Sequence, residues 1–351
     1  MNTHGRLAIG GALLIFVLVV LFGSRETPVS PETPSPFLDL STSTPEQPAA
    51  VISASEPEPE VIEEPAPEDN SRKLALALGR LRTSLVNIIC VTGTEKLHSV
   101  SGTGTLFDSR GLVLTNAHIA QLFLLKDTLP EGDIQCVIRT GSPARPSYTA
   151  TLVYISESWL RANPTTLLEQ TPRGTGKDDI AVLAITGSIS GDSLPSYFSF
   201  VSLSSKEPFL DQEVSIGSYA AQMLSSAQVT SSLYPTLVFG SIEDNFTFTD
   251  TTFDLMSLGG SAAAQNGSSG GGVVNTDGEL IGLITTSSTK GSLFSRDLRA
   301  ITSGHIRRSF SADTGLSFDS YSASQSIQTL VTRFSSQSDV LGTALAQALG
   351  L

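Results

Sequence analysis

Residues 262–286 read "AAAQNGSSGGGVVNTDGELIGLITT", a glycine-rich run followed by two apolar runs. Runs rich in glycine and serine are typical of flexible linkers when they stand alone. Here, however, apolar residues alternate through "VVNTDGELIGLI", and Asp277-Gly278 is a dipeptide that favours the tight turn of a β-hairpin. Because a linker would not lead directly into a hairpin, we predict that residues 266–272 form an ordered loop followed by two strands.

Short strand-like runs with turn residues between them recur along most of the chain, and long helical patterns are few. The first series covers residues 85–93, 101–111, 112–117, 133–141, 148–156 and 178–186. The second series covers residues 212–219, 235–242, 245–253, 271–276, 279–286 and 298–306. Short strands at this spacing are typical of an all-β sandwich or barrel. We therefore predict two tandem six-stranded antiparallel barrels, at about 84–190 and 195–310.

Seventeen uncharged residues, 7–23, form one apolar segment near the N-terminus. As a helix this segment would be roughly 25 Å long, which is at the short end for crossing a bilayer. A cleaved signal peptide is the alternative, but the segment ends in Leu21-Phe22-Gly23-Ser24 rather than in a small-x-small cleavage site. We predict an uncleaved single-pass anchor in the cell membrane. The positive-inside rule then leaves residues 1–6 in the cytoplasm and places the rest outside.

Residues 24–71 have the composition of a disordered linker. Up to residue 70 this segment holds eleven acidic residues, one basic residue and ten of the 18 prolines. Such a composition cannot bury enough apolar surface to fold. Most of the net charge of −13 lies in this linker, and the negative balance argues against a nucleic-acid partner.

Helical patterns flank the predicted strands. Four leucines between Leu74 and Leu85 share one helical face, which predicts a short packing helix before the first strand. At the other end, residues 311–351 form a tail in which 339–351 has helical spacing, with Asp339 as a candidate cap. We expect a short terminal helix that docks on the body of the protein.

Ser269 is the candidate nucleophile within the glycine-rich loop. A serine hydroxyl needs a base to take its proton and a third group to orient that base. His98 lies in a polar segment and His305 lies beside two arginines, so we predict surface positions for both. His118 instead ends the apolar strand "GLVLTNAH" and opens the apolar run "IAQLFLL". We expect it to be held rigidly at the edge of the core, where a catalytic base belongs.

The carboxylate that orients the base must be partly buried. The segment "KDDIAVLAI" places Asp178 and Asp179 at the start of a strongly apolar strand. Asp179 directly precedes the strand and is the better candidate, whereas we expect Asp178 to be solvated.

The motifs "TNAH", "DDIAVL" and "GSSGGGVVNTDGELIGL" occur in this order, with about 60 and 90 residues between the candidate residues. Together they resemble the signatures of trypsin-like serine peptidases, and those of the HtrA-type branch most. The resemblance covers roughly residues 80–310 and implies a protease domain at 72–310, with the active site in the cleft between its two barrels. HtrA-type proteins usually carry a PDZ domain after the protease, but the 41 residues that follow are too few to form one.

The resemblance implies a role for each residue of the site. His118 would be the base, Asp179 the orienting acid and Ser269 the nucleophile. The backbone N–H groups of Gly267 and Ser269 would form the oxyanion hole. A side chain at Gly267 would oppose the backbone angles that this arrangement requires.

The resemblance also places a specificity pocket beside the nucleophile. The base of the pocket is the position six residues before the serine, which here is Ala263, and the wall comes from Leu283, Ile284 and Thr285. A buried unpaired ammonium group is costly, so a basic substrate residue would be disfavoured. We therefore expect cleavage after small or medium aliphatic residues.

The two cysteines, Cys90 and Cys136, lie on the first and fourth strands of the leading barrel. Because the fourth strand of a Greek key returns beside the first, we predict a disulfide between them, as is typical of exported proteins. Two buried free thiols are the alternative. There is no C-x-x-C or H-E-x-x-H motif and only four scattered histidines, so we expect no metal or other cofactor.

Two other functions fit part of the pattern. "GSSGG" also matches the nucleophile elbow of α/β-hydrolases, but those enzymes place their acid and histidine after the serine. A catalytically silent protease-like module that only binds partners at the cell surface is the second alternative. We expect a membrane-anchored serine endopeptidase that hydrolyses exported or unfolded proteins. Its partners would be protein or peptide substrates, and the sequence leaves a homo-oligomer open.

Overall fold

The computed structural model describes residues 70–93, 95–169, 174–249, 251–287 and 291–351. Within these ranges no helix is both long and apolar enough to cross a membrane. The predicted segments 1–6 and 7–23, and all but the last two residues of the predicted linker 24–71, lie outside the described residues.

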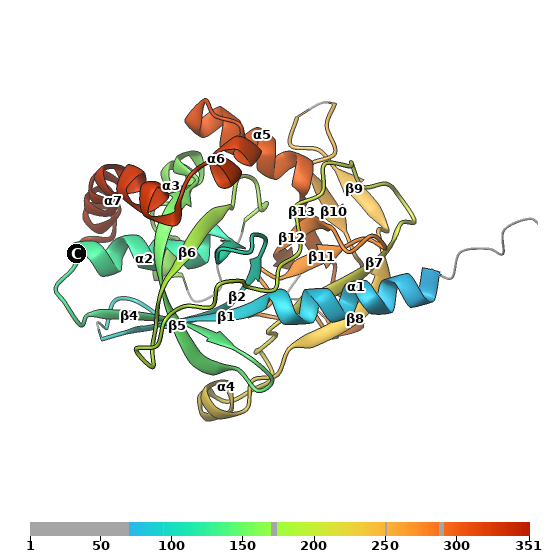
Figure 1. Cartoon of the computed structure of the whole chain (residues 1–351), viewed down its shortest axis with the longest axis horizontal. Helices are drawn as coiled ribbons and strands as arrows, with labels where there is room; N and C mark the ends of the chain where they lie inside the picture. The colour runs from blue at the N-terminus through green and yellow to red at the C-terminus, as the bar shows by residue number, and fades with distance from the viewer. Residues whose placement is uncertain (1–69, 94, 170–173, 250, 288–290) are drawn as a thin grey trace, which may run out of the picture. The chain divides into compact units, whose positions relative to one another are not determined.

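Six strands form a closed antiparallel barrel in the first half of the described chain (Figure 1). They are β1 (Leu85–Thr92), β2 (Val100–Leu106), β3 (Leu112–Thr115), β4 (Ile134–Thr140), β5 (Arg145–Ile155) and β6 (Ala181–Ser188). Around the barrel the order is β1-β2-β3-β6-β5-β4, so that β4 pairs with β1 and closes the ring. The first predicted barrel is therefore confirmed, including the return of the fourth strand beside the first.

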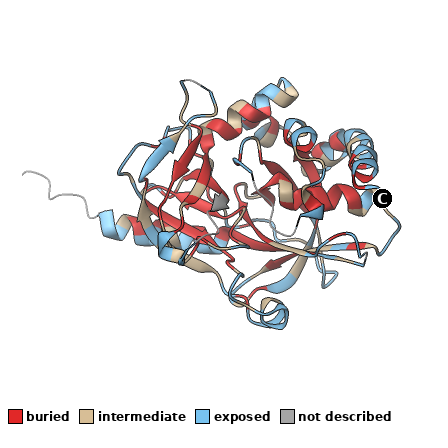
Figure 2. Cartoon of the chain, turned by 180° about the vertical axis from the view of Figure 1, so that it is seen from behind, coloured by how far each residue is buried: buried red, intermediate tan, exposed pale blue. Residues whose placement is uncertain are grey.

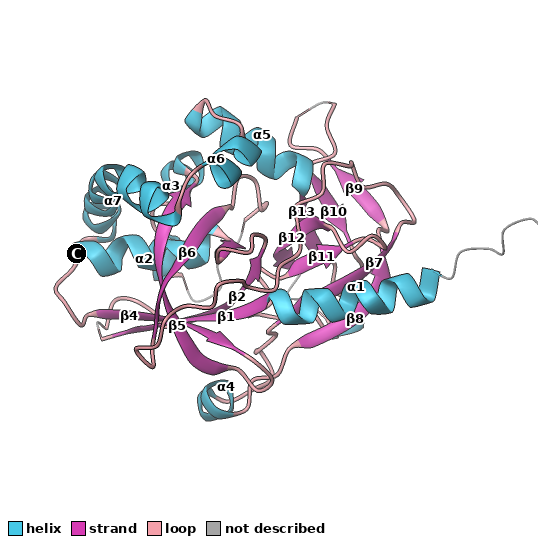
Figure 3. Ribbon diagram, viewed as in Figure 1, coloured by secondary structure: helices cyan, strands magenta, loops and turns pink. Residues whose placement is uncertain are grey.

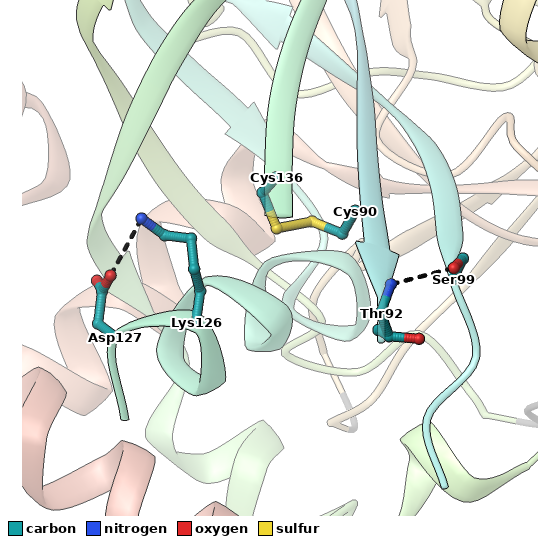
Figure 4. The surroundings of a disulfide bond; sticks show 6 residues. All are labelled: Cys90, Thr92, Ser99, Lys126, Asp127 and Cys136. Carbon is teal, nitrogen blue, oxygen red and sulfur yellow. Dashed lines mark hydrogen bonds and ion pairs between the residues drawn. A yellow bond between two sulfur atoms is a disulfide. The ribbon is translucent and has the colours of Figure 1, made fainter. Parts of the chain in front are cut away.

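A disulfide joins Cys90 on β1 to Cys136 on β4. The two residues are direct partners in the antiparallel register of these strands, as the Greek-key arrangement predicts. Figure 4 shows the bridge between the ends of the two strands, near the end of the helix that carries Lys126 and Asp127.

The second half contains a seven-stranded antiparallel sheet in the order β8-β7-β11-β12-β13-β10-β9. Its strands are β7 (Glu213–Ser218), β8 (Thr236–Ser241), β9 (Asp244–Phe246), β10 (Leu255–Ser257), β11 (Gly272–Val274), β12 (Leu280–Ser287) and β13 (Leu298–Thr302). The prediction of a second closed six-stranded barrel is wrong, because the end strands β8 and β9 do not pair with each other. No residue of β8 or β9 is fully buried, and their apolar residues Leu237, Val238 and Phe246 pack only partly against the core.

Helices surround the two sheets (Figure 3). They are α1 (Asn70–Ser84), α2 (Ala117–Thr128), α3 (Glu157–Ala162), α4 (Ser226–Ser231), α5 (Ser303–Thr314), α6 (Phe318–Ser324) and α7 (Ile327–Leu349), with short 3-10 turns at η1 (Thr166–Leu168) and η2 (Leu293–Ser295). Helix α1 matches the predicted packing helix before the first strand. Eight of the twelve residues of helix α2 are buried. A helix that is buried on most sides is apolar nearly all round, so its sequence shows no amphipathic pattern.

The C-terminal helix α7 packs against α2 at the side of the barrel (Figure 1). Its residues Phe334, Leu345 and Leu349 share one apolar cluster with residues of α2 and of the barrel strands. The expected docking of a terminal helix is confirmed, but its expected start is wrong. The helix begins twelve residues before Asp339, after the N-cap Ser326.

Three apolar clusters form the core, and buried residues run through both sheets (Figure 2). One cluster fills the barrel and reaches α2 and α7, and another lies within the second sheet. The third joins residues of both sheets, including Leu114 on β3, Val182 on β6, Leu283 on β12 and Ile301 on β13. The loops that carry the candidate residues lie at this junction.

Candidate active site

His118 is the second residue of α2, and a single connecting residue, Asn116, separates this helix from β3. The N-terminal N–H groups of a helix have no partner within the helix. The side chain of the N-cap residue Asn116 does not supply one: its Oδ1 accepts no hydrogen bond, and its Nδ2 donates to the Asp179 carbonyl at 2.8 Å. The N–H of His118 donates instead to Asp179 Oδ1 at 2.9 Å. Asp179 therefore caps the helix from another loop, and the helix N-terminus favours its negative charge.

The Asp179 carboxylate accepts two further hydrogen bonds, both on Oδ2. His118 Nδ1 lies 2.7 Å away and Thr285 Oγ1 lies 3.0 Å away. The side chain of Asp179 is 5% exposed and that of His118 is 24% exposed. Since an ionised carboxylate only accepts, the proton of neutral His118 resides on Nδ1. The Nε2 atom of His118 is then left with a lone pair.

Thr285 on β12 connects Ser269 to this pair. Its hydroxyl donates to Asp179, and its carbonyl accepts a hydrogen bond from Ser269 Oγ at 3.3 Å. In the described residues, no hydrogen bond joins Ser269 to His118. The structure thus brings the three predicted residues around one threonine, with the serine hydroxyl turned toward the Thr285 carbonyl.

Strand β2 of the barrel holds the loop around Ser269 in place. The N–H of Thr103 donates to the Ser269 carbonyl at 2.8 Å, and Thr103 Oγ1 donates to the Gly267 carbonyl at 2.7 Å. Gly270 has φ +85°, and a Cβ there would lie 1.8 Å from the Thr103 carbonyl oxygen. Only glycine fits so close to β2 in this left-handed conformation.

The N–H of Asn266 donates to no described residue, and the same holds for the two predicted oxyanion-hole donors, the N–H groups of Gly267 and Ser269. Each of these two predicted donors belongs to a peptide unit whose carbonyl is fixed. The Asn266 carbonyl accepts from the Ala221 N–H at 2.8 Å, and the Ser268 carbonyl accepts from the Gly271 N–H at 2.9 Å. Because N–H and C=O point in opposite directions across a trans peptide, both free N–H groups have fixed orientations.

A family model described as the trypsin-like peptidase domain matches residues 102–283, which is more than half of the chain. The match begins in β2, ends in β12 and includes all three predicted residues. The chain belongs to the trypsin-like peptidase family. This confirms the family predicted from the three motifs.

Solved structures similar to this trypsin-like peptidase are proteases. An inactive form of the Rv3671c protease is 14% identical, with a TM-score of 0.42, over 68% of this chain and 93% of that chain. The serine endoprotease from Yersinia pestis is 17% identical, with a TM-score of 0.42, over 76% of this chain and 68% of that chain. A second inactive form of Rv3671c, from M. tuberculosis, is 15% identical with a TM-score of 0.41, over 76% of this chain and 98% of that chain. A search of curated proteins gives no significant match.

Behind Asp179 this trypsin-like peptidase has a buried cluster of charges. His305, which is only 6% exposed, hydrogen-bonds Asp254 Oδ1 through Nδ1 at 2.9 Å and Asp178 Oδ1 through Nε2 at 3.0 Å. Arg308 also donates to Asp254, at 2.8 Å. The predicted surface position of His305 and the predicted solvation of Asp178 are both wrong, whereas His98 is exposed as expected.

The carboxylates of this cluster are held ionised. Burial by itself would raise the pKa of Asp178, but its hydrogen bond with His305 and the nearby charge of Lys177 oppose this and hold the pKa below its ordinary value. Burial would also raise the pKa of Asp254. Hydrogen bonds, of which that from Arg308 is the strongest, instead hold this pKa well below its ordinary value. Asp178 also has φ +57°, a conformation that non-glycine residues seldom adopt. The cluster thus fixes the residue that directly precedes Asp179.

The predicted pocket residues are all buried but do not share one surface. Ala263 and Ile284 lie in the apolar cluster of the second sheet, whereas Leu283 lies in the cluster between the sheets. Thr285 points its hydroxyl at Asp179, a role that the sequence did not reveal. No group of three or more His, Cys, Asp or Glu among the described residues could hold a metal ion.

Proposed function

We propose that this trypsin-like peptidase is a serine endopeptidase with His118, Asp179 and Ser269 as its catalytic triad. His118 Nε2 takes the proton of Ser269 Oγ as that oxygen bonds to the carbonyl carbon of a peptide. The N–H groups of Gly267 and Ser269 stabilise the oxyanion. His118 then protonates the leaving amine, and water releases the acyl group by the reverse sequence.

The observation that carries the proposal is the set of three hydrogen bonds to the Asp179 carboxylate. They fix the tautomer and the ring position of His118, and the shared partner Thr285 brings Ser269 to the same place. A solvated surface histidine would need none of these contacts.

The hydroxyl of Ser269 must turn from the Thr285 carbonyl to His118 for the reaction. Its present hydrogen bond of 3.3 Å is long, and a neutral hydrogen bond contributes only about 0.5–1.5 kcal/mol. A bound substrate can readily offset this cost, so the observed orientation is compatible with catalysis.

Casein hydrolysis by the full-length protein tests the proposal, with Ser269→Ala as the inactive variant. Ser268→Ala is the matched control, because it makes the same change one residue away. The Ser268 side chain is buried and accepts from Ser218 on β7 rather than lying near His118. We expect hydrolysis to be lost in Ser269→Ala and retained in Ser268→Ala. Undiminished hydrolysis by Ser269→Ala would refute the triad.

A catalytically silent module is the second candidate, and one observation favours it: no hydrogen bond joins Ser269 to His118 in the described residues. Labelling with a fluorophosphonate separates the two functions, because the reagent reacts only with an activated serine. A protein that binds peptides but leaves Ser269 unlabelled would be such a module.

We also propose that the peptidase is exported and tethered to the cell membrane. This rests on the uncharged segment 7–23, the acidic proline-rich segment after it, and the disulfide, which forms in oxidising compartments. Its substrates would be exported or unfolded proteins. Membrane fractionation followed by protease accessibility in intact cells tests both points.

A further inference from the structure

Among the described residues, Arg296 is a buried cation without a negatively charged partner. It follows the 3-10 turn η2 between β12 and β13, and its residue exposure is only 7%. Its Nη1 donates to Gln222 Oε1 at 2.7 Å and to the Ala264 carbonyl at 2.9 Å. Its Nε is buried and has no acceptor, and no described Asp or Glu forms an ion pair with it.

This environment differs from that of the other deeply buried arginine. Arg139, which is 2% exposed, donates to four acceptors through its two terminal nitrogens. Arg296 has two acceptors, both on one nitrogen. A buried charge with unsatisfied donors is costly, and an additional acceptor would lower that cost.

The contact with Ala264 places this cation on the loop that carries the nucleophile. Ala264 lies five residues before Ser269 in the same loop. Between them the backbone is held by hydrogen bonds from the Gln265 N–H to the Ala263 carbonyl and from the Ser268 N–H to the Gln265 carbonyl. Ala263 and Ala264 are fully buried and have no polar side-chain atom, so the guanidinium of Arg296 is the charged group that contacts this end of the loop.

Gln222 is an exposed residue, and its amide oxygen is the one side-chain acceptor of Arg296. A neutral amide oxygen is a weaker partner for a guanidinium than a carboxylate, which can accept two parallel hydrogen bonds. Because Gln222 can swing into solvent, a carboxylate that arrives from outside can replace it.

We propose that Arg296 is a specificity-determining residue that pairs with an acidic side chain, Asp or Glu, directly before the scissile bond. The inference rests on the triad proposed above, since it concerns the substrate of that site. It replaces the aliphatic preference expected from Ala263 and from the wall residues Leu283, Ile284 and Thr285, which did not take Arg296 into account. It agrees with the expected exclusion of Lys and Arg, which the charge of Arg296 would repel.

A panel of fluorogenic peptides that differ only before the scissile bond, with Glu, Gln, Asp, Asn, Ala, Val or Lys at that position, tests the proposal on the full-length protein. We expect kcat/KM for Glu or Asp to exceed that for the isosteric Gln or Asn by at least tenfold. In Arg296→Gln this ratio should fall to about one, while fluorophosphonate still labels Ser269. Arg299→Gln is the control, because Arg299 pairs with Asp297 and should keep the ratio.

Equal cleavage after Glu and Gln by the native protein, with Ala or Val peptides cleaved well, would overturn the role of Arg296 and leave the triad intact. Failure to cleave any peptide together with an unlabelled Ser269 would overturn both. If Arg296→Gln does not fold, the Glu-to-Gln ratio of the native protein decides the matter alone.

Discussion

Replacement of Asp179 by Asn tests whether the Asp179 carboxylate holds the proton of neutral His118 on Nδ1. The native carboxylate accepts from three donors, and one of them, the His118 N–H, is part of the backbone and can only donate. The Asn oxygen must therefore take the Oδ1 position, which leaves its NH₂ group facing His118 Nδ1 and Thr285 Oγ1. The hydroxyl of Thr285 can rotate to accept, but His118 Nδ1 can accept only if its proton moves to Nε2. The base is then blocked on the atom that must take the serine proton.

The expected loss is large, because the variant holds the wrong tautomer rather than a slightly displaced one. A change of this kind lowers kcat by about 10⁴-fold, which corresponds to roughly 5 kcal/mol of transition-state stabilisation. The fold should be retained, since Asn occupies almost the same volume and keeps the hydrogen bond that caps α2.

The assay is kcat/KM on a quenched peptide substrate, with the rate of fluorophosphonate labelling as a second measure. Asp178→Asn is the matched control, since it makes the same change in the adjacent residue. An Asn oxygen there can still accept from His305, and Asn tolerates the positive φ of this position. We expect less than a tenfold loss in Asp178→Asn. A similar small loss in Asp179→Asn would refute the reasoning.

The loop, the disulfide and the buried charges each have a substitution that tests them. Gly270→Ala should slow fluorophosphonate labelling by about 100-fold, because its Cβ would displace the loop from β2, and labelling at the native rate would contradict that packing. Loss of the disulfide in Cys90→Ser with Cys136→Ser releases a closed segment with a sequence separation of 46 residues. The gain in entropy of the unfolded chain would lower the free energy of unfolding by about 4 kcal/mol, so Tm should fall by roughly 10 °C. An unchanged Tm would argue against a structural role for the bridge. Because the folded pKa of Asp254 is lowered, its contribution to stability is complete above its ordinary pKa of about 3.9 and is lost as the pH falls below it. In urea unfolding between pH 6 and 3, Asp254→Asn should therefore lose stability less steeply than the native protein, and parallel curves would count against the cluster.

The strands of the barrel could be predicted because each is a short apolar run bounded by turn residues. The second sheet was predicted less well. The run 245–253 predicts one strand, but only its first two residues, Asn245 and Phe246, lie in β9, and β10 begins after the run. Whether a sheet closes depends on contacts between strands far apart in the chain, which local patterns do not contain.

Of the candidate site, the three motif residues could be chosen from order and local context, but their support could not. His305 lies in the polar segment "SGHIRRSF", and its burial depends on partners 51 and 127 residues away. The resemblance places Thr285 only in a pocket wall, and its hydrogen bond to Asp179 spans 106 residues, so no local pattern predicts it. Arg296 follows a loop with no recognisable motif, so only its burial and its missing partner draw attention to it.

The most direct test of the catalytic assignment is the mass of the full-length protein after reaction with diisopropyl fluorophosphate, followed by peptide mapping. The account predicts one adduct, located on Ser269, whose formation is at least 100-fold slower in His118→Ala. An unmodified protein, an adduct on a different serine, or equally fast labelling without His118 would contradict it.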